Sequence, residues 1–472
     1  MIQGAGLSPM LSNASRRGYS RGFVLIALIA VVSSLLVVLR RSGGELGLEF
    51  WVFARQYFTA YQPEVERWNR AYPDKAVAMK LVQFTALERR LLSSLRAGTR
   101  AADFMEVERM VVGETFAGPL EQIGFVDLTD RLREGGWLER FNAPSFSTWT
   151  TRGRIFGLPH DVHPVLLAYR ADVVEAAGID VSTIETWDDY QRVMAPLMTE
   201  RGRDGRPLRY LLNFWPTNAD QTEVLLLQAG GGFFDERDRP ALDTPLNVRV
   251  MARLASWCVG PERVAVDAKE MTAAGNRLRL DGGVVGTLMS DWLTGIWKLD
   301  LPGLAGRMKL MPIPAWERGG CRTSVYGGTA LMIPKTARDV EASLEFALHL
   351  YTSPATCDAF FRDVGVIPPF REHWSRPVFD EPNPYFCGQP VGRMFVEQAP
   401  HVPRRSSSPF TLEARRSYCT ALQRLVAWAE DRRVYDAAGL EPRARELLEA
   451  AQADLLRRVQ RNAFLREEVA GR

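Results

Sequence analysis

Cysteine and lysine are scarce in this chain of 472 residues, and their scarcity excludes several kinds of site. The five cysteines are widely spaced and form no CxxC pair, which argues against a zinc ribbon or a dithiol redox motif. The five thiols are expected to form one or two disulfides at most. Lysine occurs at only six positions, and the net charge is +3, so a clustered basic surface for nucleic acid is not indicated.

Sequence motifs of common enzymes are also missing. The chain contains many Asp and Glu residues but no HExxH, no P-loop and no nucleophile elbow. With 46% hydrophobic and 24% charged residues, its composition is that of an ordinary globular protein, and its length suffices for two packed cores. We see no internal repeats, and residues 406–408 are the one low-complexity run.

Residues 23–39 form an uncharged apolar run close to the N-terminus. As a helix this run would span about 25 Å, which suffices for a slightly thinned bilayer. Arginine is more frequent before the run than after it, which favours a cytoplasmic, disordered segment 1–22 and an exported remainder. The run therefore predicts a transmembrane signal-anchor at 23–39.

A cleaved signal peptide is the alternative to this anchor. The run is long for such a peptide, and it ends in Leu39, Arg40 and Arg41, a poor cleavage site. Residues 15–19 are similar to a twin-arginine export signal. No cysteine lies nearby, which excludes a lipobox anchor.

The remaining chain begins with alternating strand and helix patterns. Strands are predicted at 48–53, 76–82 and 103–107, and helices at 54–72 and 85–96. A β-α-β-α-β order is typical of a doubly wound α/β sheet. Two further apolar strands, at 153–159 and 165–169, are predicted to be joined by a short polar turn.

Short segments with recognisable sequences follow in a fixed order. They are RIFGLPHD (154–161), AAGID (176–180), TWDDY (186–190), GGGFFD (230–235), VGTLMSDW (285–292), YGGTALMI (326–333) and GVIP (365–368). This ordered set resembles the extracellular solute-binding proteins of sugar ABC importers. Phe156 and Arg170 stand where that family has Tyr and Asn.

The resemblance implies a specific architecture, which would be the two-lobed, periplasmic-binding-protein-like (type II) α/β fold with a hinge, preceded here by one transmembrane helix. The first lobe would comprise residues 46–167 plus 317–370, and the second residues 170–308 plus 372–470. The strands around 165–169 and 308–314 would lie at the crossovers between the lobes.

The resemblance also implies a function, in which lobe closure captures a mono- or oligosaccharide for an ABC permease. The soluble part would lie in the periplasm or extracytoplasmic space, tethered to the inner membrane. The chain would be no enzyme and would need no catalytic residue, cofactor or metal.

Candidate ligand contacts come from sugar chemistry, because hydroxyls favour bidentate polar groups and C–H faces favour aromatic rings. In doubly wound sheets such groups follow the carboxyl ends of strands. Residues in those places are Arg55, Gln56, Glu108, Arg109, His160, Asp161, His163, Trp215, Asp291, Trp292, Tyr326, Gly327 and Gly328. By resemblance, Trp292 and the turn Tyr326-Gly327-Gly328 are expected to line the cleft, with glycines that let a ligand approach the backbone.

Each candidate also has a plainer interpretation. Asp161 would otherwise be a turn residue that caps backbone groups. His160 and His163 would need a third ligand to bind a metal, and they lie in a predicted turn, so hinge-proximal polar residues are favoured over a metal site. Most tryptophans, Trp68 and Trp257 among them, have helical spacing and are expected in the core.

Two other functions stay open at this stage. One is a membrane-anchored glycoside hydrolase with paired carboxylates. The other is a ligand-sensing module that feeds no transporter. Binding proteins of this fold also carry polyamines, iron or anions, and the supply of aromatic residues favours a carbohydrate.

Overall fold

The structure is a computed structural model that describes residues 21–42, 47–203 and 205–462. Helix α1 (Arg21–Ser42) contains the predicted anchor and belongs to a unit separate from the compact unit that begins at Gly47. In the described ranges, no helix is both long and apolar enough to cross a membrane. Residues 1–20 of the predicted cytoplasmic segment and 463–470 of the predicted second lobe lie outside the described residues.

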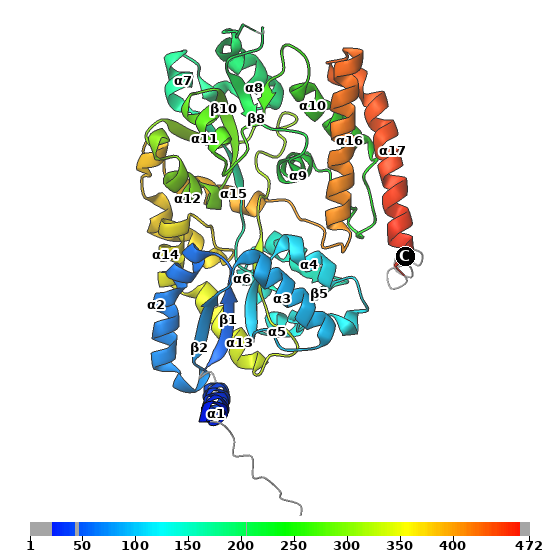
Figure 1. Ribbon diagram of the computed structural model, residues 1–472. Helices are drawn as coiled ribbons and strands as arrows, with labels where there is room; N and C mark the ends of the chain where they lie inside the picture. Colours follow the sequence, from blue (N-terminus) through cyan, green and yellow to red (C-terminus); the bar gives the residue numbers. More distant parts are fainter. Residues whose placement is uncertain (1–20, 43–46, 204, 463–472) are drawn as a thin grey trace, which may run out of the picture. The chain divides into compact units, whose positions relative to one another are not determined.

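The compact unit contains two five-stranded sheets in its described part (Figure 1). The first has the order β2-β1-β3-β12-β6. β1 pairs in parallel with β2 and β3, and β12 pairs antiparallel with β3 and β6. Its strands are β1 (Leu48–Val52), β2 (Val77–Leu81), β3 (Phe104–Glu108), β6 (Leu158–Pro159) and β12 (Thr329–Met332).

The second sheet has the order β11-β7-β10-β8-β9. β7 pairs antiparallel with β10 and β11, and β8 pairs in parallel with β9 and β10. Its strands are β7 (Val165–Arg170), β8 (Tyr210–Asn213), β9 (Ala265–Val266), β10 (Val284–Ser290) and β11 (Met308–Pro312). All of β7 lies in this sheet, so the predicted lobe boundary at residue 167 falls inside a strand.

Helices cover both faces of each sheet, as expected for an α/β fold. One face of the first sheet packs against five helices: α2 (Arg55–Ala71), α5 (Thr129–Glu134), α6 (Trp137–Arg140), α13 (Val340–Thr352) and α14 (Pro354–Val364). The other face of this sheet packs against α3 (Phe84–Ala97) and α4 (Arg109–Thr115). One face of the second sheet packs against six helices: α7 (Ala171–Ala176), α8 (Trp187–Met194), α9 (Ala219–Gln228), α10 (Pro245–Cys258), α16 (Thr411–Arg432) and α17 (Ala437–Arg461). The other face of this sheet packs against α12 (Asp291–Asp300) and α15 (Val391–Gln398). The short helix α11 (Ala273–Leu280) precedes β10.

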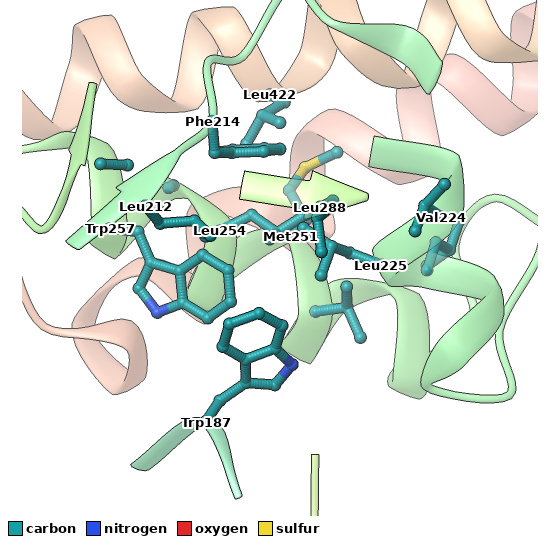
Figure 2. Close-up of a cluster of buried hydrophobic side chains, with 14 of the residues drawn as sticks. Trp187, Leu212, Phe214, Val224, Leu225, Met251, Leu254, Trp257, Leu288 and Leu422 are labelled. Atoms are coloured by element: carbon teal, nitrogen blue, oxygen red, sulfur yellow. The ribbon is translucent and has the colours of Figure 1, made fainter. Parts of the chain in front are cut away.

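The alternation of side chains along β7 shows why the second sheet needs two covering layers. Val165, Leu167 and Tyr169 enter one hydrophobic cluster, whereas Leu166 and Ala168 enter another on the opposite face. Figure 2 shows the larger cluster, where α10 supplies Trp257, whose ring centroid lies 5.0 Å from that of Trp187. A strand such as β7, apolar up to its last residue Arg170 and buried throughout, is typical of a sheet covered on both faces.

The chain passes between the sheets at two adjacent places. Residues 160–164 join β6 of the first sheet to β7 of the second, and residues 313–328 join β11 of the second to β12 of the first. The predicted strands 153–159 and 165–169 correspond to β5 with β6 and to β7, and the predicted turn between them is the connection from the first sheet to the second. The two connections touch, since the Tyr326 amide donates a hydrogen bond to the His163 carbonyl at 3.0 Å.

Residues 399–410, which we call the strap, join α15 to α16, and both of these helices pack on the second sheet. Along it the Arg405 amide donates to Ser147 Oγ at 3.0 Å, and the Ser407 hydroxyl donates to the Thr150 carbonyl at 2.5 Å. Ser147 and Thr150 precede β5 (Arg154–Ile155), next to the first sheet, whereas α16 packs on the second. This strap therefore runs along both lobes.

Candidate ligand-binding site

A hydrogen-bonded bridge of Asp161, His163 and Asp291 lies where the first connection meets the second sheet. His163 Nε2 lies 3.0 Å from Asp161 Oδ2, and His163 Nδ1 lies 2.7 Å from Asp291 Oδ1. Asp161 follows β6, and Asp291 begins α12 directly after β10. This Asp–His–Asp bridge joins the end of a first-sheet strand to the end of a second-sheet strand.

Electrostatics favour a charged imidazole in the bridge. Burial alone would lower the pKa of His163, but the neighbouring carboxylates of Asp161 and Asp291 raise it to about 10. Burial alone would raise the pKa of Asp161, but His163 and His160 hold the pKa of that carboxyl well below its usual range. With both ring nitrogens facing carboxylates, His163 donates two hydrogen bonds and carries a positive charge near neutral pH.

The carboxylates of the bridge also bind backbone groups. Asp161 Oδ2 accepts from the Thr329 amide at 3.0 Å. Asp291 Oδ1 accepts from the Trp292 amide at 2.8 Å, and its Oδ2 accepts from the Ile367 amide at 2.7 Å. Because Thr329 opens β12 and Ile367 follows α14, the bridge fixes four chain segments to one another.

Trp292 and the turn at Tyr326 lie against this bridge. The indole N–H of Trp292 donates to the Tyr326 carbonyl at 2.7 Å, and the two rings meet edge to face with centroids 5.6 Å apart. Trp292 is only half-buried, yet it packs against core clusters of both lobes. Gly327 has φ +122°, and a Cβ there would press on the His163 ring and lie 3.0 Å from Trp292 Nε1. This position therefore requires glycine.

A second group of charged residues joins the lobes beside Gly328. We call Arg109, Asp220, Glu223, Arg405 and Arg415 the arginine cluster. Arg109 begins α4 after β3, and its Nη1 donates to Glu223 Oε2 at 3.1 Å, while its Nη2 pairs with Asp220. Asp220 and Glu223 lie in α9, which follows β8 of the second sheet. Arg109 thus links the carboxyl end of a first-lobe strand to the second lobe.

Two further arginines complete the cluster. Arg415, in α16, pairs with Glu223 and donates from Nη2 to Asp220 Oδ1 at 2.6 Å. Arg405, in the strap, donates from Nη2 to the Val325 carbonyl at 2.6 Å and from Nη1 to the Gly327 carbonyl. Figure 1 shows α16 near α4 and α9, and it contacts both. The cluster therefore gathers residues from both sheets and from the strap.

Burial and charge together determine the protonation of the cluster. Burial alone would lower the pKa of Arg109, but Glu223 and Asp220 raise it. For Arg405, burial and the nearby Arg109 outweigh the opposing effect of Glu223 and lower its pKa to about 9. Next to the cluster, burial raises the pKa of Glu108, whose carboxylate caps α4 by accepting from the Met110 amide at 2.7 Å.

His160 contacts Asp161 from inside the first lobe. Its Nδ1 lies 2.9 Å from Asp161 Oδ2, but its ring packs among Tyr57, Tyr351 and Phe360. Glu106 is fully buried beside it, and burial raises the pKa of that carboxyl to about 7. His160 and His163 therefore both contact the Asp161 carboxylate, from different sides.

The remaining predicted residues lie near the strand ends but outside these clusters. Arg55 and Gln56 are exposed at the start of α2, after β1. Trp215 is half-buried two residues beyond the end of β8. In the described ranges no group of three His, Cys, Asp or Glu side chains could hold a metal ion, and none of the five cysteines is paired.

Comparison with known proteins gives the family. Residues 55–356 match the family of bacterial extracellular solute-binding proteins, a match that spans most of the chain. The chain belongs to this family. Solute-binding proteins similar to it include the arabinooligosaccharide-binding protein of Halalkalibacterium halodurans, 25% identical over 390 residues, which covers 80% of this chain and 84% of that protein. The arabinooligosaccharide-binding protein of Bacillus subtilis is 27% identical over 372 residues, covering 77% and 82%.

Solved structures of solute-binding proteins share the fold. The sugar-binding protein MalE from Xanthomonas citri superposes with a TM-score of 0.70 at 18% identity, covering 87% of this chain and 98% of that chain. An extracellular solute-binding protein of family 1 gives 0.69 at 19% identity, covering 86% and 100%. The predicted two-lobed α/β fold and the sugar-importer family are thereby confirmed.

Four charged residues of the site of this solute-binding protein escaped the sequence analysis: Asp220, Glu223, Arg405 and Arg415. Asp220 and Glu223 are three positions apart on α9, a few residues after Trp215, and that spacing was the available signal. Nothing near Arg405 and Arg415 in the sequence distinguishes them from the many other arginines. Only the packing of α16 and the strap brings them to Arg109.

Proposed function

We propose that this solute-binding protein captures an oligosaccharide outside the cytoplasm and delivers it to an ABC permease by closing its two lobes. One observation carries the proposal. Arg109 at a first-sheet strand end pairs directly with Asp220 and Glu223 beyond a second-sheet strand end, so polar groups of the two lobes converge. Binding sites of open α/β sheets lie at such strand ends. The arabinooligosaccharide-binding relatives support a carbohydrate ligand.

The proposed ligand contacts fall into two groups. Trp215 and Trp292 offer aromatic faces, while Gln56, Glu108 and Arg109 offer polar groups. These five residues form the first group. The second group lies where the connections 160–164 and 313–328 meet, and it consists of His160, Asp161, Asp291, Tyr326, Gly327 and Gly328. Asp161 and Asp291 bind protein groups, so we assign them first to positioning Trp292 and the glycine turn.

Lobe closure is part of the proposal. The moving bodies would be the two predicted lobes, except that the first segment of lobe one would end at residue 164 instead of 167, so that all of β7 belongs to the second lobe. The two adjoining connections and residues 365–390, which lead from α14 on the first sheet to α15 on the second, would form the hinge. Rotation there would separate Arg109 from Asp220 and Glu223, and ligand binding would favour the closed state by its higher affinity for it.

Thermal unfolding of the detergent-solubilised full chain tests the binding function. Arabinotetraose, maltotetraose and other neutral oligosaccharides are added in turn, and a ligand at 100 Kd should stabilise the protein by about 2.7 kcal/mol. Calorimetry on Trp215→Ala should then show at least tenfold weaker binding of the active sugar. Trp137→Ala, a half-buried tryptophan in α6, is the matched control and should bind normally.

Two outcomes would contradict the proposal. Absence of any sugar among the stabilising compounds would remove the carbohydrate assignment. Hydrolysis of an added oligosaccharide by the purified protein would instead favour the glycoside hydrolase named above, because a binding protein releases its ligand unchanged.

We also propose that residues 23–39 tether the protein to the inner membrane as an uncleaved signal-anchor. The uncharged run and the poor cleavage site at Leu39 support this, while the described helices add no support of their own. Mass spectrometry of the membrane-extracted protein should find a chain that retains these residues. A mature N-terminus near residue 42 would mean a cleaved signal peptide.

A further inference from the structure

The strap belongs to the second lobe through its two ends and through one bond in its middle. Its ends continue into α15 and α16, which both pack on the second sheet. In its middle, the Ser406 hydroxyl donates to Asp238 Oδ1 at 2.6 Å, and Asp238 lies in the segment between Phe234 and Leu242, which pack in the larger cluster on that sheet. The strap would therefore move with the second lobe when the lobes separate.

The same strap is hydrogen-bonded to the first lobe on either side of Ser406. The Arg405 amide donates to Ser147 Oγ at 3.0 Å, and the Ser407 hydroxyl donates to the Thr150 carbonyl at 2.5 Å. Ser147 and Thr150 belong to a segment that packs on the first sheet. Both serine side chains are buried, so water has little access to these bonds while the lobes are together. Two hydrogen bonds of the strap thus cross from one lobe to the other.

Further contacts between the lobes lie close to the strap. A Cβ at Gly113 in α4 would lie 3.1 Å from the Ser408 carbonyl oxygen, so the strap backbone lies directly against this first-lobe helix. At the end of α17, the side-chain amide of Asn462 donates to the Ala117 carbonyl at 3.1 Å. α17 packs on the second sheet, whereas Ala117 follows α4 on the first, and Figure 1 shows α16 and α17 reaching down to the level of α4. The strap, α16 and α17 therefore form one edge of the second lobe that touches the first lobe at several points.

The strap also contacts the glycine turn at the proposed ligand site. Arg405 donates from Nη2 to the Val325 carbonyl at 2.6 Å and from Nη1 to the Gly327 carbonyl. Both carbonyls belong to the connection 313–328, and Gly327 lies against Trp292. The backbone amide of Arg405 binds the first lobe while its side chain binds the turn. A shift of the turn on ligand binding would therefore reach the strap through a single residue.

We propose that the strap is a latch, which holds the two lobes together through its bonds to Ser147 and Thr150 and slows the release of a bound sugar. The inference rests on the proposed function, since it assumes that the lobes open and close around a ligand. The bond of the strap to Asp238 stays within the second lobe. Separation of the lobes must therefore break the contacts at Ser147, Thr150 and Gly113, and these contacts favour the closed state.

Two adjacent serines of the strap provide a matched test on the full-length protein in detergent. Ser407→Ala removes the bond to Thr150 in the first lobe. The control, Ser406→Ala, removes the bonds to Asp238 and to the Ser408 amide, which both lie outside the first lobe. Loss of one hydrogen bond changes an equilibrium about fivefold. We therefore expect Ser407→Ala to release arabinotetraose about five times faster than wild type. It should also have a larger radius of gyration in solution scattering with contrast-matched detergent, whereas Ser406→Ala should keep both wild-type values.

The two measurements separate the latch from the sugar-binding function. A Ser407→Ala variant with the radius of gyration of wild type would overturn the latch, and so would an equal increase in Ser406→Ala. If wild type binds no sugar, the proposed function is contradicted, while the radius of gyration still decides on the latch. Circular dichroism confirms that each variant folds. If Ser407→Ala unfolds, Ser147→Ala replaces it, because it removes the acceptor of the Arg405 amide on the first-lobe side, and an unchanged radius in that variant would equally contradict the latch.

Discussion

His163 Nδ1 lies 2.7 Å from Asp291 Oδ1, and this contact joins the first connection between the lobes to the start of α12. The two residues are far apart in the sequence, and both are buried. His163 adopts φ +56°, so the backbone takes an uncommon conformation to present the ring to both aspartates. The contact therefore orders the region where Trp292 and the glycine turn meet.

The bridge predicts a pH-dependent stability. The folded pKa of His163, about 10, exceeds its ordinary value of 6.5, so its contribution is complete below pH 6.5 and is lost as the pH rises through 10. His163→Gln should lower the free energy of unfolding by about 3 kcal/mol at pH 6 and by much less at pH 10. Urea denaturation at both values measures this. The exposed His401→Gln is the control, and a His163→Gln effect that does not vary with pH would contradict the charged bridge.

Substitution of Glu106 is expected to stabilise the protein at high pH, whereas substitution of His163 is expected to destabilise it at low pH. Its folded pKa of about 7 exceeds the ordinary 4.5, so the folded state is favoured below pH 4.5 and loses this advantage as the pH rises through 7. Glu106→Gln removes the cost of burying the charge while leaving an oxygen to accept from Tyr61, whose hydroxyl lies 2.8 Å from Oε1. At pH 8 the variant should be about 2 kcal/mol more stable, relative to wild type, than at pH 5. Equal differences at the two pH values would show that this carboxyl keeps an ordinary pKa.

Gly327 tests the packing of the turn. An alanine there combines φ +122° with a Cβ pressed between the His163 ring and Trp292 Nε1, so we expect Gly327→Ala to cost about 3 kcal/mol. Gly319→Ala is a matched control, because Gly319 also has a positive φ, +72°, but open space around it, and it should cost about 1 kcal/mol. Thermal unfolding compares the two. Similar losses would mean that backbone conformation alone requires these glycines.

A substitution of Arg109 tests whether its ion pairs with Asp220 and Glu223 hold the two lobes together. Arg109→Gln removes the pairs with Asp220 and Glu223 and should increase the radius of gyration in solution scattering, at a cost in stability of about 3 kcal/mol. Arg131→Gln, whose ion pair with Glu341 stays within the first lobe, should leave the radius unchanged. Circular dichroism confirms that both variants fold, and a folded Arg109→Gln with the wild-type radius would refute the closing role.

The sequence alone determined the order of elements and the family. The first three strands and their helices could be predicted because apolar spacing and chain breakers act within a few residues of each other. The glycine pair 327–328 was identified as a turn, and both residues adopt positive φ. Asp161, Asp291 and Arg109 were chosen as candidates because they follow strands, and all three lie at strand ends in the fold.

Only the tertiary structure decided which of these residues meet. Residues 160–164 had the pattern of a turn, and their role as a connection between sheets depends on β7 pairing with β10 and β11 far along the chain. Arg405 and Arg415 have no local signal, because a charged residue in a strap or on a helix is usually solvated. The packing of α16 against α9 and α4 brings them to Arg109. Strand ends follow from local periodicity, whereas contacts across the lobes depend on sheet order, which sequence spacing does not encode.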